Sequence, residues 1–205
     1  MRLLLENRQV TDRDIVRADG STALHWASRN GHCDIIPLRL STGLVDVNMP
    51  DAAGKRALHS AAAKGHVGVV HILLDQGSRA DLESTCGDYA IHDASANGHV
   101  DVVEALAGKM SDILITGSKG TTLTLAVVNQ HSSVVKFILR YARTRVIRVS
   151  RLSRLLYKAV ENGDVVTLDM LLRHADETNP PESTTFRYGR LLRPVATPSR
   201  CSVCC

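Results

Sequence analysis

Aromatic side chains are scarce in this chain, where tryptophan, tyrosine and phenylalanine together make up 3% of the 205 residues. Proteins that bind single-stranded nucleic acid stack bases on such rings, so the composition disfavours that class of partner. No apolar run approaches the roughly 18 residues that a membrane-spanning helix needs. Glu6 ends the leucine run at residues 3–5 too soon for a signal-peptide core. We therefore expect a cytoplasmic or nuclear protein that is not secreted.

The sequence also lacks the short motifs that mark common enzymes and cofactor sites. It has no Gly-x-Ser-x-Gly elbow, no His-Glu-x-x-His, no phosphate-binding loop and no dinucleotide-binding fingerprint. Its five cysteines are an odd number, and three of them crowd at the C-terminus, so no disulfide framework is indicated. We expect a protein that is not an enzyme and that uses neither a cofactor nor a metal.

What the sequence does contain is a segment that recurs about every 33 residues. Gly-His pairs end at His32, His66 and His99, and degenerate copies follow at His131 and Asp164. Each copy has an apolar residue eight positions before this marker, an alanine five positions before it, and in the first four copies a pair of branched apolar residues after it. The apolar pairs are Ile35-Ile36, Val69-Val70, Val102-Val103 and Val134-Val135.

Each copy predicts two short helices joined by a turn. Val69, Val70 and Leu73 fall on one stripe of a helix, and a single helical pair cannot bury that stripe alone. Stacked copies would bury it in a continuous core. A glycine such as Gly65 suits the turn because it tolerates positive φ. The repeated histidines are expected to satisfy turn backbone groups and not to bind metal.

These residues resemble the ankyrin repeat. Gly20-Ser21-Thr22-Ala23-Leu24-His25 is similar to the Gly-x-Thr-Pro-Leu-His turn of that family, with alanine in place of proline. The resemblance covers about residues 1–175. It implies an all-α ankyrin-repeat solenoid of stacked helix–turn–helix units with a flexible C-terminal tail. It also implies a non-enzymatic protein–protein interaction module (adaptor, scaffold or inhibitor) that binds a partner protein through the concave helix faces and inter-repeat turns.

The repeat register predicts how the chain is divided. Pro37 is placed beyond the first turn of the second helix of the first repeat, where it is expected to kink or shorten that helix. The predicted segments are 1–18, the remnant of a preceding repeat; 19–50, 51–83 and 84–116, the first three repeats; 117–148 and 149–175, two degenerate repeats; and 176–205, a disordered tail.

Variable positions of the stack are the predicted contacts with the partner. By match to the family, they are the position after the repeated Leu-His, the pair before the Gly-His turn, and the turn tips. The same match places Leu125 and Lys158 at exposed positions. Trp26, the only tryptophan, is the best candidate for a hot spot, although it could instead cover the open N-terminal end of the stack. The predicted partner-binding residues are Trp26, Arg29, Asn30, Asp51, Lys55, Arg56, Ser60, Lys64, Asp88, Asp93 and Asn97.

Positive charge is concentrated in the last third of the chain. Residues 1–139 carry 13 Lys and Arg against 15 Asp and Glu, whereas residues 140–205 carry 12 against 6. Arginine suits carboxylates and phosphates, so an alternative function is a basic-patch module tethering to anionic lipid or nucleic acid. A solvated basic loop is the simpler interpretation of the same residues. The predicted patch comprises Arg140, Arg143, Arg145, Arg148, Arg151 and Arg154.

The chain ends in Cys204 and Cys205, which suggests lipid attachment as a further hypothesis. Ser202 stands where a prenylation box has its cysteine, so the usual motif is not matched. We therefore expect membrane binding only if this tail is lipidated, and we expect the main partner to be another protein.

Overall fold

The computed structural model describes residues 17–41, 45–141 and 149–178. Its helices come in consecutive pairs, and a short turn joins the two helices of four of these pairs. The helices are α2 (Ala23–Arg29) with α3 (Ile35–Leu40), α4 (Ala57–Lys64) with α5 (Val67–Asp75), α6 (Ala90–Ala96) with α7 (Val100–Ala107), α8 (Thr122–Val128) with α9 (Ser132–Tyr141), and α10 (Val149–Glu161) with α11 (Val165–Thr178).

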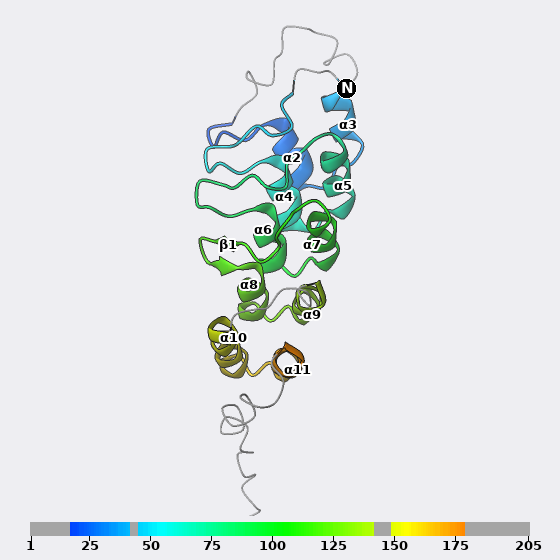
Figure 1. Cartoon of the computed structure of the whole chain (residues 1–205). Coiled ribbons are helices and arrows are strands. Elements are labelled where there is room, and N and C mark those ends of the chain that lie inside the picture. Colours follow the sequence, from blue (N-terminus) through cyan, green and yellow to red (C-terminus); the bar gives the residue numbers. More distant parts are fainter. Residues whose placement is uncertain (1–16, 42–44, 142–148, 179–205) are drawn as a thin grey trace, which may run out of the picture.

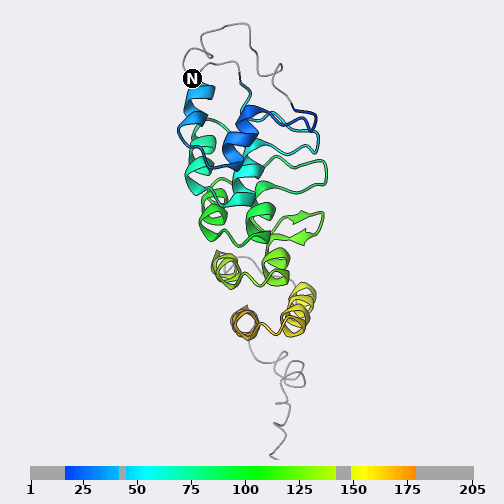
Figure 2. The ribbon, with the colours of Figure 1, turned by 180° about the vertical axis from the view of Figure 1, so that it is seen from behind.

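The pairs stack in chain order into an elongated array (Figure 1). The first helices α2, α4, α6, α8 and α10 form one column, and the second helices form another beside it. Turns that connect successive pairs project sideways from the first-helix column, as the opposite view also shows (Figure 2). In the turn before α8, β1 (Thr116–Gly117) pairs antiparallel with β2 (Gly120–Thr121). The predicted all-α solenoid is confirmed.

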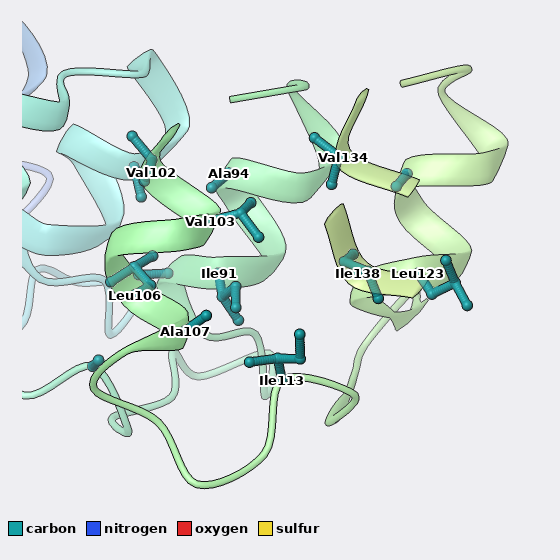
Figure 3. Close-up of a cluster of buried hydrophobic side chains, with 14 of the residues drawn as sticks. Ile91, Ala94, Val102, Val103, Leu106, Ala107, Ile113, Leu123, Val134 and Ile138 are labelled. Atoms are coloured by element: carbon teal, nitrogen blue, oxygen red, sulfur yellow. The ribbon is translucent and has the colours of Figure 1, made fainter. Parts of the chain in front are cut away.

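Apolar side chains from neighbouring pairs share one core. Figure 3 shows this at the third and fourth pairs, where Ile91 and Val103 lie near Val134 and Ile138. All four of these side chains are fully buried. The small Ala94 on α6 is also fully buried, and its size allows the helices to approach closely. Burial of one stripe by the next copy is what the 33-residue period predicts.

A glycine and a histidine interlock successive pairs. Gly65 ends α4 at a φ of 75°, and a Cβ added to it would lie 2.5 Å from Nδ1 of His99 in the next pair. Nε2 of His99 lies 3.3 Å from the carbonyl oxygen of Ala63. The predicted role of these histidines is confirmed, and the backbone groups they satisfy belong to the preceding repeat. The same arrangement joins Gly31 to His66 and Gly98 to His131.

A second set of histidines ties the first helices α2, α4 and α6 to the next projecting turn. Nδ1 of His59 accepts a hydrogen bond from the backbone N–H of Arg56, so its Nε2 carries the proton and donates to the carbonyl of Asp88, 3.2 Å away. The ring thus accepts a hydrogen bond from the backbone at the start of α4 and donates one to the next projecting turn. His25 and His92 do the same for the carbonyls of Lys55 and Ile115.

The structure corrects the predicted position of Pro37. Helix α3 begins at Ile35, so Pro37 is its third residue and lies within the first turn. The backbone N–H groups of a first turn have no acceptor inside the helix, and the proline therefore removes no helical hydrogen bond. The helix is short, with six residues against nine in α5.

Parts of the predicted segmentation lie outside the described residues, including most of the N-terminal remnant and residues 179–205 of the tail. Helix α11 continues to Thr178, three residues into the range assigned to the tail. Within the described ranges, no helix is long and apolar enough to cross a membrane.

Candidate functional site

Trp26 lies on the outer face of α2 and is held in a fixed orientation. Its Nε1 donates a hydrogen bond to Oγ of Ser21, 3.0 Å away. The guanidinium carbons of Arg17 and Arg29 lie 4.6 and 5.8 Å from the ring centroid, within the range of cation–π attraction. The side chain nevertheless remains 36% exposed. The structure therefore presents an oriented, partly exposed indole between two cations.

A small pocket of about 60 Å³ opens beside this ring. Asp19 and Asp51 come from successive projecting turns, and Asp19 accepts a hydrogen bond from Oγ of Ser21 that lowers the pKa of its carboxyl below the ordinary value. The pocket therefore places carboxylates beside an aromatic ring and an arginine, a combination suited to binding a partner's side chain. Its lining residues are Asp19, Ser21, His25, Trp26, Arg29, Asp51 and Ser60.

An ion pair braces the same surface further along the stack. Nζ of Lys55, in the turn before α4, lies 3.1 Å from both carboxylate oxygens of Asp93 on α6. The side chains are 39% and 19% exposed, so the pair is partly shielded from water. It spans two repeats and fixes the turn that also carries Asp51.

Four of the predicted contact residues already make hydrogen bonds within the protein, two of them between successive turns and two within their own helical segment. The guanidinium of Arg56 donates to the carbonyls of Gly54 and Glu83 in two successive turns. Both carboxylate oxygens of Asp88 accept hydrogen bonds from Ser118 of the next turn. The amides of Asn30 and Asn97 donate to carbonyls four residues earlier on their own helices.

The position after the repeated Leu-His is not exposed in every copy. Trp26 is exposed and Ser60, Asp93 and Lys158 are half-buried, but Leu125 on α8 is only 8% exposed. The predicted exposure of Leu125 is wrong, because a leucine at this place gains free energy by leaving water. Of the remaining predicted contacts, Arg29 and Lys64 are exposed.

The predicted basic patch is only partly described. Arg140 at the end of α9 and Arg154 on α10 are exposed. Arg143, Arg145 and Arg148 lie outside the described residues, and so does the side chain of Arg151. Cys204 and Cys205 lie outside them too.

A second hollow was not anticipated from the sequence. It has a volume of about 340 Å³ and lies between the β1–β2 turn, α8 and α10. The sequence identified Arg154 and Lys158 separately, but no pattern linked them to Lys119 more than 30 residues away. Arg17 was missed for the same reason, because its contact with Trp26 depends on the fold of the first turn. The residues that line the hollow are Thr116, Lys119, Gly120, Thr121, Thr124, Val128, Arg154, Leu155 and Lys158.

Across the three described ranges, no group of three or more His, Cys, Asp or Glu side chains is placed to hold a metal ion. A family profile described as ankyrin repeats in three copies matches residues 1–84 and 73–148. A search of curated proteins finds no match to the chain.

Proposed function

The chain belongs to the ankyrin-repeat family, whose members generally mediate protein–protein interactions, and from this premise we propose that it is a non-enzymatic adaptor, scaffold or inhibitor. It binds a partner protein with the surface formed by the first helices and the projecting turns. The observation that carries this proposal is the setting of Trp26.

Exposed tryptophan beside a pocket is the kind of residue that dominates binding energy at protein interfaces. The pocket beside Trp26 is shared between two repeats, because Ser60 lies on α4 and Asp51 lies in the turn before it. This position favours a partner contact over a role in covering the N-terminal end, since the ring borders a cavity that faces the second repeat.

The surface is also preorganised. The hydrogen bond of Trp26 to Ser21 and the ion pair of Lys55 with Asp93 fix side chains before any partner arrives. Backbone hydrogen bonds from Ala52 to Asp19 and from Thr85 to Ala53 join successive turns. Binding to this surface therefore costs less conformational entropy, and so less affinity, than binding to a mobile loop would.

Affinity capture with the full chain and with Trp26→Ala tests the proposal. If Trp26 is a hot spot, the substitution should reduce retention of the partner about thirtyfold or more, because hot-spot truncations cost about 2 kcal/mol or more. His71→Ala serves as the control, because His71 is exposed on α5 in the opposite column. Quantitative mass spectrometry of the captured proteins gives the measurement.

Thermal unfolding of the same variants separates the two roles of Trp26. A partner-binding role predicts reduced capture with a nearly unchanged midpoint. Unchanged capture together with a lowered midpoint would assign Trp26 to the end of the stack and remove it from the proposed interface.

A further inference from the structure

The 340 Å³ hollow between the β1–β2 turn, α8 and α10 is an independent candidate for a binding site, which we name the α8–α10 groove. Three cations from two elements border it: Lys119 in the β1–β2 turn, and Arg154 and Lys158 one helical turn apart on α10. No carboxylate is among the described residues that line it. The groove is therefore an electropositive concavity.

The cations of the groove are available to an incoming anion. Within the described part of the chain, neither Lys119 nor Arg154 has an ion-pair partner. Asp88 interacts electrostatically with Lys119, but both of its oxygens already accept hydrogen bonds from Ser118. Lys158 pairs with Glu161 at 2.9 Å, and the two side chains are 42% and 68% exposed, so exchanging this partner costs little.

The floor of the groove is apolar and its walls are fixed. Val128 at the end of α8 is 40% exposed, which is a large exposure for a valine, and Leu155 of α10 lies beside the same hollow. Nδ2 of Asn162 donates to the carbonyls of Val127 and Val128, at 3.1 and 3.2 Å. This bond ties the turn after α10 to the end of α8 and sets the spacing of the two helices.

We propose that the α8–α10 groove binds an acidic segment of a partner protein. Carboxylates of the segment pair with Lys119, Arg154 and Lys158, and an apolar side chain between them covers Val128. This inference rests on the proposed protein-binding function and specifies the chemistry of the partner. Charge complementarity with the three cations favours acidic residues in the partner's segment. The exposed Val128 among these cations favours an apolar residue between them.

The same features argue against a nucleic acid or a lipid surface as the occupant. Bases would need aromatic rings to stack on, and no aromatic side chain lines the groove among the described residues. A membrane surface is broad and flat, whereas these cations surround a hollow that accommodates a few side chains. An extended peptide fits both the size and the mixture of charge and apolar surface.

Fluorescence anisotropy with the full chain provides the test. The probe is a fluorescein-labelled ten-residue peptide in which leucine alternates with pairs of glutamates. Comparison probes are the same peptide with glutamine for glutamate, the same peptide with serine for leucine, single-stranded DNA of equal charge, and phosphatidylserine vesicles. The variants are K119Q, R154Q, K158Q and their triple combination. Matched controls are K136Q and K109Q, which remove exposed cations that neither line the groove nor belong to the predicted basic patch.

We expect the glutamate–leucine peptide to bind best. Each single groove variant should weaken it about threefold to fivefold, and the triple variant about thirtyfold or more, because exposed ion pairs contribute up to about 1 kcal/mol each. The controls should change affinity less than twofold. V128E should abolish binding by placing a carboxylate on the floor. Circular dichroism confirms that each variant keeps its helices.

Three results would overturn the proposal. One is a triple variant that binds the peptide as well as the unaltered chain does. Another is equal binding of the serine peptide, which would remove the role of Val128. The third is DNA or vesicles binding more tightly than the peptide through the same residues. Capture by the unaltered chain is measured separately, so a groove that fails while capture persists leaves the proposed function standing. Failure of the unaltered chain to capture any partner would contradict the proposed function, on which the groove's role rests.

Discussion

Individual histidines in this chain have a structural role that depends on their being neutral. Burial lowers the pKa of His59 to about 4 from its ordinary value of 6.5, with a partial opposing effect from Asp93. The pKa of His92 is lowered by burial as well. The neutral ring donates from Nε2 and accepts at Nδ1, and protonation would remove the acceptor that the N–H of Arg56 requires.

The buried histidines predict a pH dependence of stability. The unfolded chain protonates His59 near pH 6.5, whereas the folded protein keeps it neutral down to about pH 4. Protonation therefore favours the unfolded state between these values. We expect the free energy of unfolding to be highest above pH 6.5 and to fall as the pH drops toward 4, with His59 contributing up to about 3 kcal/mol of this loss.

Urea unfolding at a series of pH values measures this dependence. His59→Gln should be less stable at pH 7, because it loses the bridge to the next turn, and its stability should change less between pH 6.5 and 4. His71→Gln on the exposed face of α5 is the matched control for the loss of a histidine. If His59→Gln leaves the change of the free energy of unfolding with pH unaltered, that result would contradict the assignment of this pH dependence to His59.

At the scale of elements, each of the first three helical pairs is fixed to the next by the glycine that follows its first helix. The contact between Gly65 and the ring of His99 leaves no room for a side chain. Gly163 has a similar φ of 67°, but nothing lies within 4 Å of the position of its Cβ. The two glycines therefore separate the effect of backbone conformation from the effect of packing between pairs.

We expect Gly65→Ala to lower the free energy of unfolding by about 3 kcal/mol and Gly163→Ala by only about 1 kcal/mol. Positive φ strains an alanine at both sites, and only at Gly65 must the neighbouring pair also move. Both substitutions restrict the unfolded chain equally, so that contribution cancels. Chemical denaturation measures the free energy of unfolding of both variants. Equal losses of free energy would show that the close contact between Gly65 and His99 contributes nothing to stability.

For the whole molecule, stability depends on how many neighbours a pair has. The pairs α4–α5 and α6–α7 are covered by another pair on each side, whereas α10–α11 has one described neighbour in the stack (Figure 1). Val160, Val165 and Val166 of that last pair are more than half exposed. In a linear array, local stability is a sum of intrinsic and nearest-neighbour contributions, so the ends open first.

Hydrogen exchange followed by mass spectrometry measures this difference. We expect amides of α4 to α7 to be protected to within about 1 kcal/mol of the global free energy of unfolding, and those of α10 and α11 to exchange faster through local opening. Binding of the acidic peptide to the α8–α10 groove should slow exchange in α10. Uniform exchange along the stack would indicate that it unfolds as one cooperative unit.

The sequence by itself determined the repeating unit. Leu58, His59, Ala61, Gly65 and Val69 have counterparts at the same spacing because each copy must bury the stripe of its neighbour and satisfy that neighbour's turn. Stacking favours similar side chains at matching positions, most clearly in the first three copies, so the period, the helical pairs and the roles of the histidines follow from local patterns. The place of Pro37 within the first turn of α3 became clear only from where the helix begins.

Only the tertiary structure decided which polar residues are free to meet a partner. Arg56 and Asp88 fit the variable positions as well as Ser60 does, yet they are engaged by neighbouring turns. The contacts of Trp26 with two arginines, and the approach of Lys119 to α10, join residues with no shared pattern. Such contacts depend on the conformation of each projecting turn and on the spacing of stacked pairs, which the repeat period does not encode.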